Sequence, residues 1–161
     1  MNAALVILLL VLLQRLGELV LAARNTAALR TQGYQEAGAS HYPVIVAFHV
    51  IWLAGLFLLA RDAHVNWWFI AAFVILQGLR LWVLATLGRR WTTRVMVKPG
   101  EKLVASGPYK IISHPNYAVV IGEIFVLPLA FGFYAYSLIG GLINIAIVWY
   151  RISVEGKALR P

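Results

Sequence analysis

Two polar segments of the chain contain the side chains best suited to chemistry, and both adjoin long apolar stretches. The first, residues 103–117, reads LVASGPYKIISHPNY and combines a histidine and two tyrosines with Gly and Pro residues that favour turns. The second, near the C-terminus, places Arg151 four residues before Glu155. Lipid cannot satisfy the hydrogen bonds of irregular backbone, so the first segment must lie in water as a loop or be held by protein around a ligand.

Arg151 and Glu155 share one face of any helix that continues through them. They could form an ordinary ion pair at the end of a membrane helix, with the Arg151 side chain reaching into water, and spacing alone favours this interpretation. In the alternative, Arg151 binds an anionic or enolic oxygen of an acceptor. Glu155, which only accepts hydrogen bonds when ionised, would then receive the hydrogens of a ribose or an amino group.

His114 is expected to lie just outside a helix that begins at Pro115. Proline restricts the residue before it to extended geometry and is favourable at the first helical position. A histidine at such a place is more often a structural hydrogen-bonding group than a ligand contact. The other histidines show no metal-ligand spacing around His114, and the chain has no cysteine, so we expect no metal site.

Charged residues within apolar stretches are costly in hydrocarbon and require partners. Arg15 and Glu18 are three residues apart and are expected to neutralise each other. Glu123 has no basic neighbour in the sequence, and Arg80 and Gln77 are its candidate partners. An incompletely paired Glu123 could act as a general base, and helix packing explains it about equally well.

The elements that position these side chains are apolar helices. The 161 residues are expected to form one domain, residues 1–161. The composition is 61% hydrophobic and 12% charged, against about 25% charged in typical soluble proteins, and this predicts an integral membrane protein. Apolar runs at residues 2–23, 43–60 and 67–87 each approach the roughly 20 residues that cross a bilayer.

A fourth apolar block, residues 117–150, is interrupted near its middle by Pro128 and Gly132. It predicts a helical hairpin made of residues 117–130 and about 134–153. The fold class is therefore an all-α membrane protein with about five transmembrane helices, the last two forming a hairpin.

Basic residues indicate how the chain is oriented in the membrane. The formal charge of +8 comes from bases in short loops beside apolar spans, which favours an orientation signal over nucleic-acid binding. The positive-inside rule places residues 87–114 and the C-terminus in the cytoplasm and the N-terminus outside. The first apolar run lacks the basic start of a signal peptide and is expected to be a retained helix.

Within the basic loop, Lys98-Pro99-Gly100-Glu101 predicts a type II turn. A small β-hairpin of residues 93–97 with 102–105 could surround this turn. Trp91 could stack on an adenine or anchor at the membrane interface, and the interface is favoured. No G-x-G-x-x-G follows a strand and no Walker loop occurs, which excludes a soluble Rossmann-type cofactor site.

GPY followed by HPNY, together with the tail R-x-x-x-E, resembles the isoprenylcysteine carboxyl methyltransferase family. The likeness is to its small bacterial branch, which includes alkylpyrone O-methyltransferases, and covers about residues 87–159. It implies an enzyme of the bacterial inner (cell) membrane that binds S-adenosyl-L-methionine between the cytosolic loop, the hairpin and the C-terminal segment. Ser113 and Gly156 stand where the family usually has Arg and a second Glu.

The resemblance also implies roles for individual residues. Arg151 would face the acceptor. The residues that would line or bind the cofactor are Glu101, Lys102, Leu103, Val104, Tyr109, His114, Pro115, Asn116, Tyr117 and Glu155.

The sequence leaves three functions open. The leading expectation is methylation of a carboxylate, enol or hydroxyl oxygen on a lipophilic small molecule dissolved in membrane lipid. NADPH-dependent membrane reductases share the HPxY loop, and the bases of residues 89–94 could bind the phosphates of such a cofactor. A non-catalytic membrane adaptor could use the same fold. The R-x-x-x-E tail favours the methyl donor.

Overall fold

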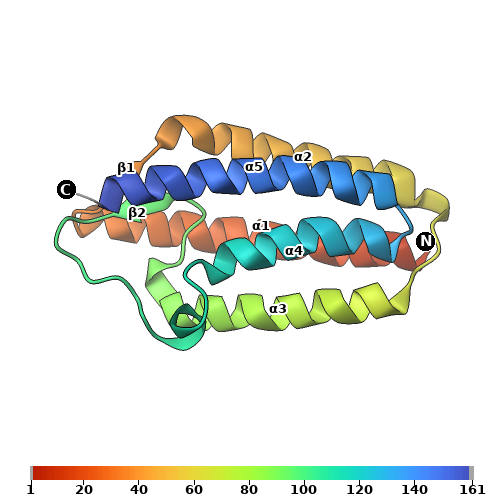
Figure 1. Ribbon diagram of the computed structural model, residues 1–161, viewed down its shortest axis with the longest axis horizontal. Coiled ribbons are helices and arrows are strands. Elements are labelled where there is room, and N and C mark those ends of the chain that lie inside the picture. Colours follow the sequence, from red (N-terminus) through yellow and green to blue (C-terminus); the bar gives the residue numbers. More distant parts are fainter. Residues whose placement is uncertain (1, 160–161) are drawn as a thin grey trace.

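Residues 2–159, which the computed structural model describes, form five α-helices that run side by side along the molecule (Figure 1). The helices are α1 (Ala3–Thr31), α2 (Tyr42–Leu59), α3 (Trp67–Leu87), α4 (Pro115–Ala130) and α5 (Tyr134–Leu159). Four of the described helices are long and apolar enough to cross a membrane, and α4, with 16 residues, is shorter. The predicted all-α membrane fold is confirmed.

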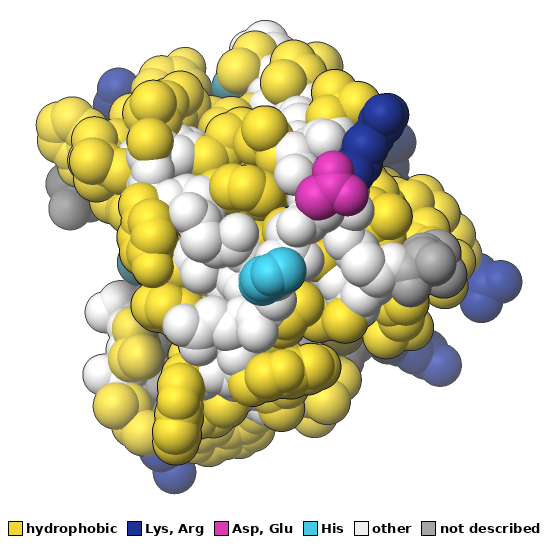
Figure 2. All heavy atoms as spheres, turned by 90° about the vertical axis from the view of Figure 1, so that its right-hand side faces the viewer, with side chains coloured by type: hydrophobic (Ala, Val, Ile, Leu, Met, Phe, Trp, Pro, Cys, Tyr) yellow, Lys and Arg dark blue, Asp and Glu magenta, His cyan; other side chains and the backbone are white. Residues whose placement is uncertain are grey.

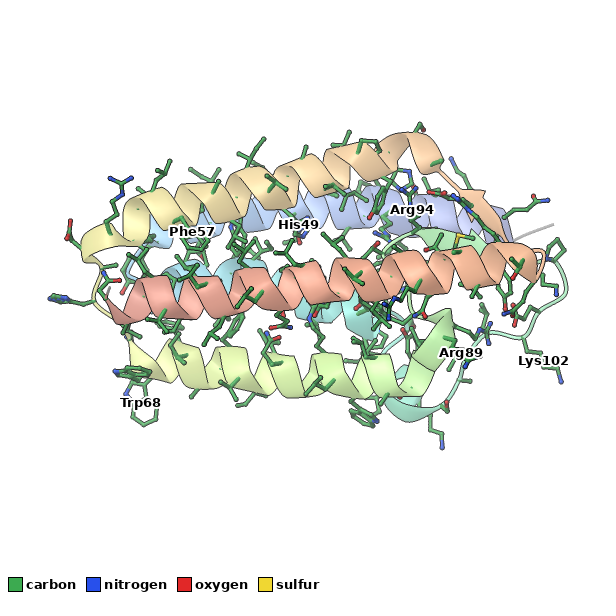
Figure 3. All side chains as sticks on the ribbon, turned by 180° about the vertical axis from the view of Figure 1, so that it is seen from behind. His49, Phe57, Trp68, Arg89, Arg94 and Lys102 are labelled. Carbon is green, nitrogen blue, oxygen red and sulfur yellow. The ribbon has the colours of Figure 1, made fainter. Side chains whose placement is uncertain are left out.

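The two ends of the bundle differ in character. The start of α1 lies at one end and the end of α5 at the other (Figure 1). We call the end that holds residues 88–114 and the end of α5 the loop end, and Arg89, Arg94 and Lys102 all lie there (Figure 3). Figure 2 shows the opposite end, where hydrophobic side chains predominate and charged ones are sparse.

The helix α1 is longer than the sequence pattern indicated. It was expected to end near residue 23, but it continues to Thr31 because Arg24 and Asn25 are followed by good helix formers. Its 29 residues span about 43 Å, more than the roughly 30 Å of a bilayer's hydrocarbon. The last turns of α1 therefore extend beyond the apolar part of the bundle and reach the loop end.

The hairpin of α4 and α5 begins and turns as predicted. His114 precedes the first residue of α4, Pro115, and its carbonyl accepts hydrogen bonds from Tyr117 and Ala118 at 3.1 and 3.2 Å. The hairpin turns at Gly132, whose φ of +81° belongs to the left-handed region. The helix α4 then packs between α3 and α5.

The predicted β-hairpin is wrong, although the turn inside it is present. The amide of Glu101 donates to the carbonyl of Lys98 at 3.2 Å, and Gly100 has the φ of +77° that a type II turn needs. The strand β2 (Val95–Val97), however, pairs antiparallel with β1 (Gln35–Ala37) from the α1–α2 connection. The reason is electrostatic in part, because Glu36 on β1 forms ion pairs with Arg94 beside β2 and with Arg30.

Short 3-10 segments complete the connections. They are η1 (Ala39–His41), η2 (Ala60–Asp62), η3 (Gly88–Arg90) and η4 (Gly107–Lys110). The last contains GPY and packs against α3. Gly107 adopts φ +56°, and a Cβ there would collide with Thr86, so glycine is what allows the loop to approach α3.

Candidate functional site

A cavity of about 250 Å³ opens among the loop, β2 and the ends of α4 and α5. We call it the loop-end cavity. It collects most of the residues that the family resemblance singled out. Those that line it are Glu101, Leu103, Val104, Tyr109, His114, Asn116, Tyr117, Arg151 and Glu155.

Two of the predicted cofactor residues do not line this cavity. The Lys102 side chain is exposed, and its carbonyl accepts a hydrogen bond from Arg90 at 3.3 Å. Pro115 is buried as the first residue of α4.

Tyr117 connects the two charged residues of the tail. Nε of Arg151 donates to the Tyr117 hydroxyl at 3.0 Å, and this hydroxyl donates to Oε2 of Glu155 at 2.7 Å. A second Arg151 nitrogen, Nη2, donates to the carbonyl of Thr93 at 2.7 Å. Within residues 2–159, Arg151 and Glu155 form no direct ion pair of the ordinary kind. The tyrosine holds them on either side of one hydroxyl.

His114 closes the same group of side chains. Its ring stacks on the Tyr117 ring with centroids 5.3 Å apart, and its Nδ1 lies 4.0 Å from Oε2 of Glu155. The side chain is 37% exposed, so it faces water from the edge of the cavity. His114 thus has both the structural position expected of it and access to a ligand.

Tyr109 lines the same cavity with a neutral hydroxyl. Burial, together with the nearby charge of Glu155, raises the pKa of Tyr109 to about 12. Its hydroxyl therefore remains protonated throughout the physiological range.

The sequence did not single out several other residues that line the cavity. Tyr34 lies in the α1–α2 connection, Val95, Met96 and Val97 form β2, and Thr92 and Lys98 lie on either side of that strand. The available signal in the sequence was the pair of short β-favouring stretches that form the two strands. It was too brief to show which two stretches pair.

Trp91 is not the interfacial anchor that was expected. It is 2% exposed and packs with Ala22 and Val83. Its indole Nε1 and the side-chain oxygen of Asn116 are buried and find no hydrogen-bond partner in the described part of the chain. Buried polar atoms normally have partners, so these two, on the wall of the loop-end cavity, fit a ligand with polar groups.

Glu123 belongs to a paired network of charges inside the bundle. Its carboxylate oxygens accept from Arg15 at 2.6 Å, from Gln77 at 2.7 Å, and from Arg80. Arg15 and Arg80 also contact Glu18, at 2.7 and 3.0 Å. The expected partners Arg80 and Gln77 and the expected Arg15–Glu18 pair are confirmed. The condition for a general base, incomplete pairing, is not met, because both carboxylate oxygens are engaged.

A second cavity of about 410 Å³ lies between the helices, and its wall is mostly apolar. We call it the membrane cavity. It shares four lining residues with the loop-end cavity, namely Trp91, Asn116, Tyr117 and Arg151. A polar space that faces water and an apolar space within the membrane therefore adjoin at the Arg151–Tyr117 pair.

These features define an integral membrane protein in which a water-facing polar site meets a site for an apolar molecule. Comparison with known proteins places it in a family. Residues 68–161 match the isoprenylcysteine carboxyl methyltransferase (ICMT) family, and the chain belongs to that family of membrane methyltransferases. It is 39% identical over 156 residues to the uncharacterized protein YpbQ of Bacillus subtilis (strain 168), covering 94% of this chain and 93% of that protein. No solved structure matches the chain.

Proposed function

We propose that the protein transfers a methyl group from S-adenosyl-L-methionine to a carboxylate or enol oxygen of a lipophilic small molecule. The observation that carries this proposal is the junction of the two cavities at Arg151 and Tyr117. A water-soluble donor and a membrane-dissolved acceptor need such a junction to meet.

The loop-end cavity has the chemical groups that the donor requires. When bound, S-adenosyl-L-methionine supplies an electrophilic methyl group on a sulfonium sulfur. Glu155 would accept hydrogen bonds from its ribose or amino group. The unpaired Asn116 side-chain oxygen and Trp91 N–H offer one further hydrogen-bond acceptor and one further hydrogen-bond donor.

Arg151 would hold the acceptor oxygen. Arg151 lines both cavities, and its positive charge would favour the ionised form of a carboxylate or enol. An acceptor that is already an anion needs no general base, which agrees with the full engagement of Glu123. The protein would contribute alignment and the exclusion of water.

The membrane cavity would receive the apolar part of the acceptor. Exposed residues on two helices reach its wall, Leu16 on α1 and Val50 on α2, so a molecule in the bilayer could approach sideways. In the proposed orientation the loop end lies in the cytoplasm of a bacterial cell, where soluble donors are available.

A nicotinamide cofactor is less well served by the same site. Arg90 pairs with Glu101 at 3.2 Å, and Arg94 pairs with Glu36. These arginines are therefore partly neutralised and offer less charge to the cofactor's phosphates.

Calorimetric titration of the detergent-purified protein with S-adenosylhomocysteine, beside a titration with NADPH, tests the proposal. We expect saturable binding of S-adenosylhomocysteine, weakened about tenfold or more in Glu155→Gln because a charge-assisted hydrogen bond is lost, and weakened in His114→Ala. Lys110→Ala is the control, since Lys110 is exposed in the same loop and does not line the cavity.

Two outcomes would overturn the proposal. Binding of NADPH alone would assign the protein to the reductases. Binding of neither compound, by protein that a thermal scan shows to be folded, would favour an adaptor without catalysis.

A further inference from the structure

The membrane cavity contains polar side chains that the methyl-transfer site does not use. Asn144 on α5 is fully buried, and both polar atoms of its amide lack a hydrogen-bond partner within residues 2–159. Trp52 on α2 is 8% exposed, and its indole N–H is likewise unpartnered there. Both residues line the cavity. An amide left unpaired among apolar side chains is costly, so these groups require an explanation.

Gly140 brings the two groups toward one another. A helical side chain leans toward the N-terminus of its helix, so Asn144 leans over the turn that holds Gly140. A Cβ on Gly140 would lie 3.1 Å from Nε1 of Trp52. The Trp52 indole N–H therefore lies in the space left by the missing side chain of Gly140, on the side toward which the Asn144 amide leans.

His49 adds an acceptor to the same wall. Its Nδ1 lies 2.8 Å from the carbonyl of Ile45, and because a carbonyl can only accept, Nδ1 carries the hydrogen and Nε2 is left as an acceptor. His49 lines the membrane cavity and points from α2 toward α1 (Figure 3). The cavity wall thus offers a donor from Trp52, an acceptor from His49, and both from Asn144.

Asn144 stands at a defined distance from the proposed reacting end. Asn144 precedes Arg151 by seven residues, which is two helical turns on one face and about 10 Å along α5. A chain whose acidic oxygen lies at Arg151 would pass Asn144 partway along its length.

We propose that Asn144 and Trp52 form a second recognition point for a hydroxyl or keto oxygen within the apolar chain of the acceptor. The inference rests on the proposed function in taking Arg151 as the place of the acidic oxygen. A hydroxyl uses the site best, because it accepts from the Trp52 N–H and donates to the Asn144 oxygen or to His49. A keto oxygen only accepts, and a methylene leaves all three groups unpaired.

The test is equilibrium competition against radiolabelled palmitate, carried out with the full-length purified protein. The competitors are palmitate, a series of hydroxypalmitates with the hydroxyl at successive carbons, and the keto analogue of the tightest isomer. We expect one mid-chain hydroxy isomer to bind about tenfold more tightly than palmitate, the keto analogue to fall between them, and isomers with the hydroxyl near either end to show no gain.

Two variants locate the effect, and one serves as the control. Asn144→Leu and Trp52→Phe should lose the preference for the mid-chain isomer. Asn144→Leu should melt no lower than wild type, because the amide it removes has no partner in the described chain. Ser137→Ala on the same helix should keep the preference. Its buried hydroxyl donates to the Phe125 carbonyl at 2.7 Å, and it does not line the cavity.

Equal affinity for all isomers, or a preference that survives in both variants, would overturn the inference. If Asn144→Leu does not fold, the isomer series with wild type and Trp52→Phe still decides. A titration with S-adenosylhomocysteine on the same preparations separates the two proposals. Donor binding without an isomer preference would remove only this inference, whereas an isomer preference without donor binding would remove only the proposed methyl transfer.

Discussion

Tyr117 is the residue on which the geometry of the site depends most. Its hydroxyl accepts a hydrogen bond from Arg151 and donates one to Glu155, and its ring stacks against the His114 ring. Glu155 is thereby directed toward the water-facing cavity, while Arg151 stands at the boundary with the membrane cavity. Tyr117 therefore positions both Glu155, the proposed contact to the methyl donor, and Arg151, the proposed contact to the methyl acceptor.

We therefore expect Tyr117→Phe to weaken S-adenosylhomocysteine binding roughly tenfold, the size of one lost hydrogen bond to a charged group. Without the hydroxyl, Glu155 and Arg151 can approach each other and pair directly. Calorimetry measures the change. Tyr134→Phe makes the same substitution at an exposed position on α5 far from the site and should bind as wild type does. Unchanged affinity in Tyr117→Phe would show that the hydroxyl does not position Glu155.

At the scale of elements, the two-stranded sheet attaches the loop of residues 88–114 to the end of α1. Glu36 is central to it, because it pairs with Arg30 at 2.8 Å and with Arg94. Burial by itself would raise the pKa of the Glu36 carboxyl, but the hydrogen bonds from Arg94 and Arg30 outweigh burial and hold that pKa below its ordinary value.

The lowered pKa of Glu36 predicts that the folded state loses stability in acid. A carboxyl whose pKa is lower in the folded state stabilises fully above its unfolded pKa, and that stabilisation is lost as the pH falls through the folded pKa. We expect the melting temperature of wild type to fall more steeply below about pH 4.5 than that of Glu36→Gln. Thermal scans in detergent from neutral to acidic pH measure both, and parallel curves would contradict the prediction.

The charge network within the bundle ties α1, α3 and α4 together. Arg80 is buried and contacts both Glu18 and Glu123. Removing one partner of a buried pair leaves an uncompensated charge, and typically costs about 3–5 kcal/mol. Arg80→Met should therefore lower the melting temperature strongly, whereas Arg89→Met, at an exposed position, should leave it nearly unchanged. Equal melting of the two variants would argue against a structural network.

At the scale of the whole molecule, the two ends of the bundle are expected to face different compartments. The loop end collects the basic residues, and the short α2–α3 connection at the other end has Arg61 beside Asp62. Because the chain has no cysteine, single cysteines can report the orientation. The proposed site requires its loop to face the soluble donor.

We expect Asp62→Cys to react with a membrane-impermeant maleimide in intact protoplasts. Lys102→Cys should react only after the membrane is permeabilised, because the positive-inside rule retains the basic loop in the cytoplasm. Both side chains are exposed, so access is limited by the membrane alone. The reverse pattern of labelling would place the loop outside and would remove the basis for a cytosolic donor.

The sequence by itself determined the features that depend on residues close together in the chain. Apolar length defined α2 and α3 to within a residue or two, because a span is set by local hydropathy. Proline chemistry marked the start of α4 at Pro115, and Pro-Gly marked the turn before Glu101. The motifs GPY, HPNY and R-x-x-x-E likewise indicated the family, which the match over residues 68–161 confirms.

Only the tertiary structure decided which distant segments meet. It paired β2 with β1, placed Tyr117 between Arg151 and Glu155, buried Trp91, and joined the two cavities along four shared lining residues. Glu36 and Arg94 are separated by 58 positions, and Arg15 and Glu123 by 108. Such contacts depend on how whole helices pack. Local hydropathy and turn chemistry contain no information about that packing.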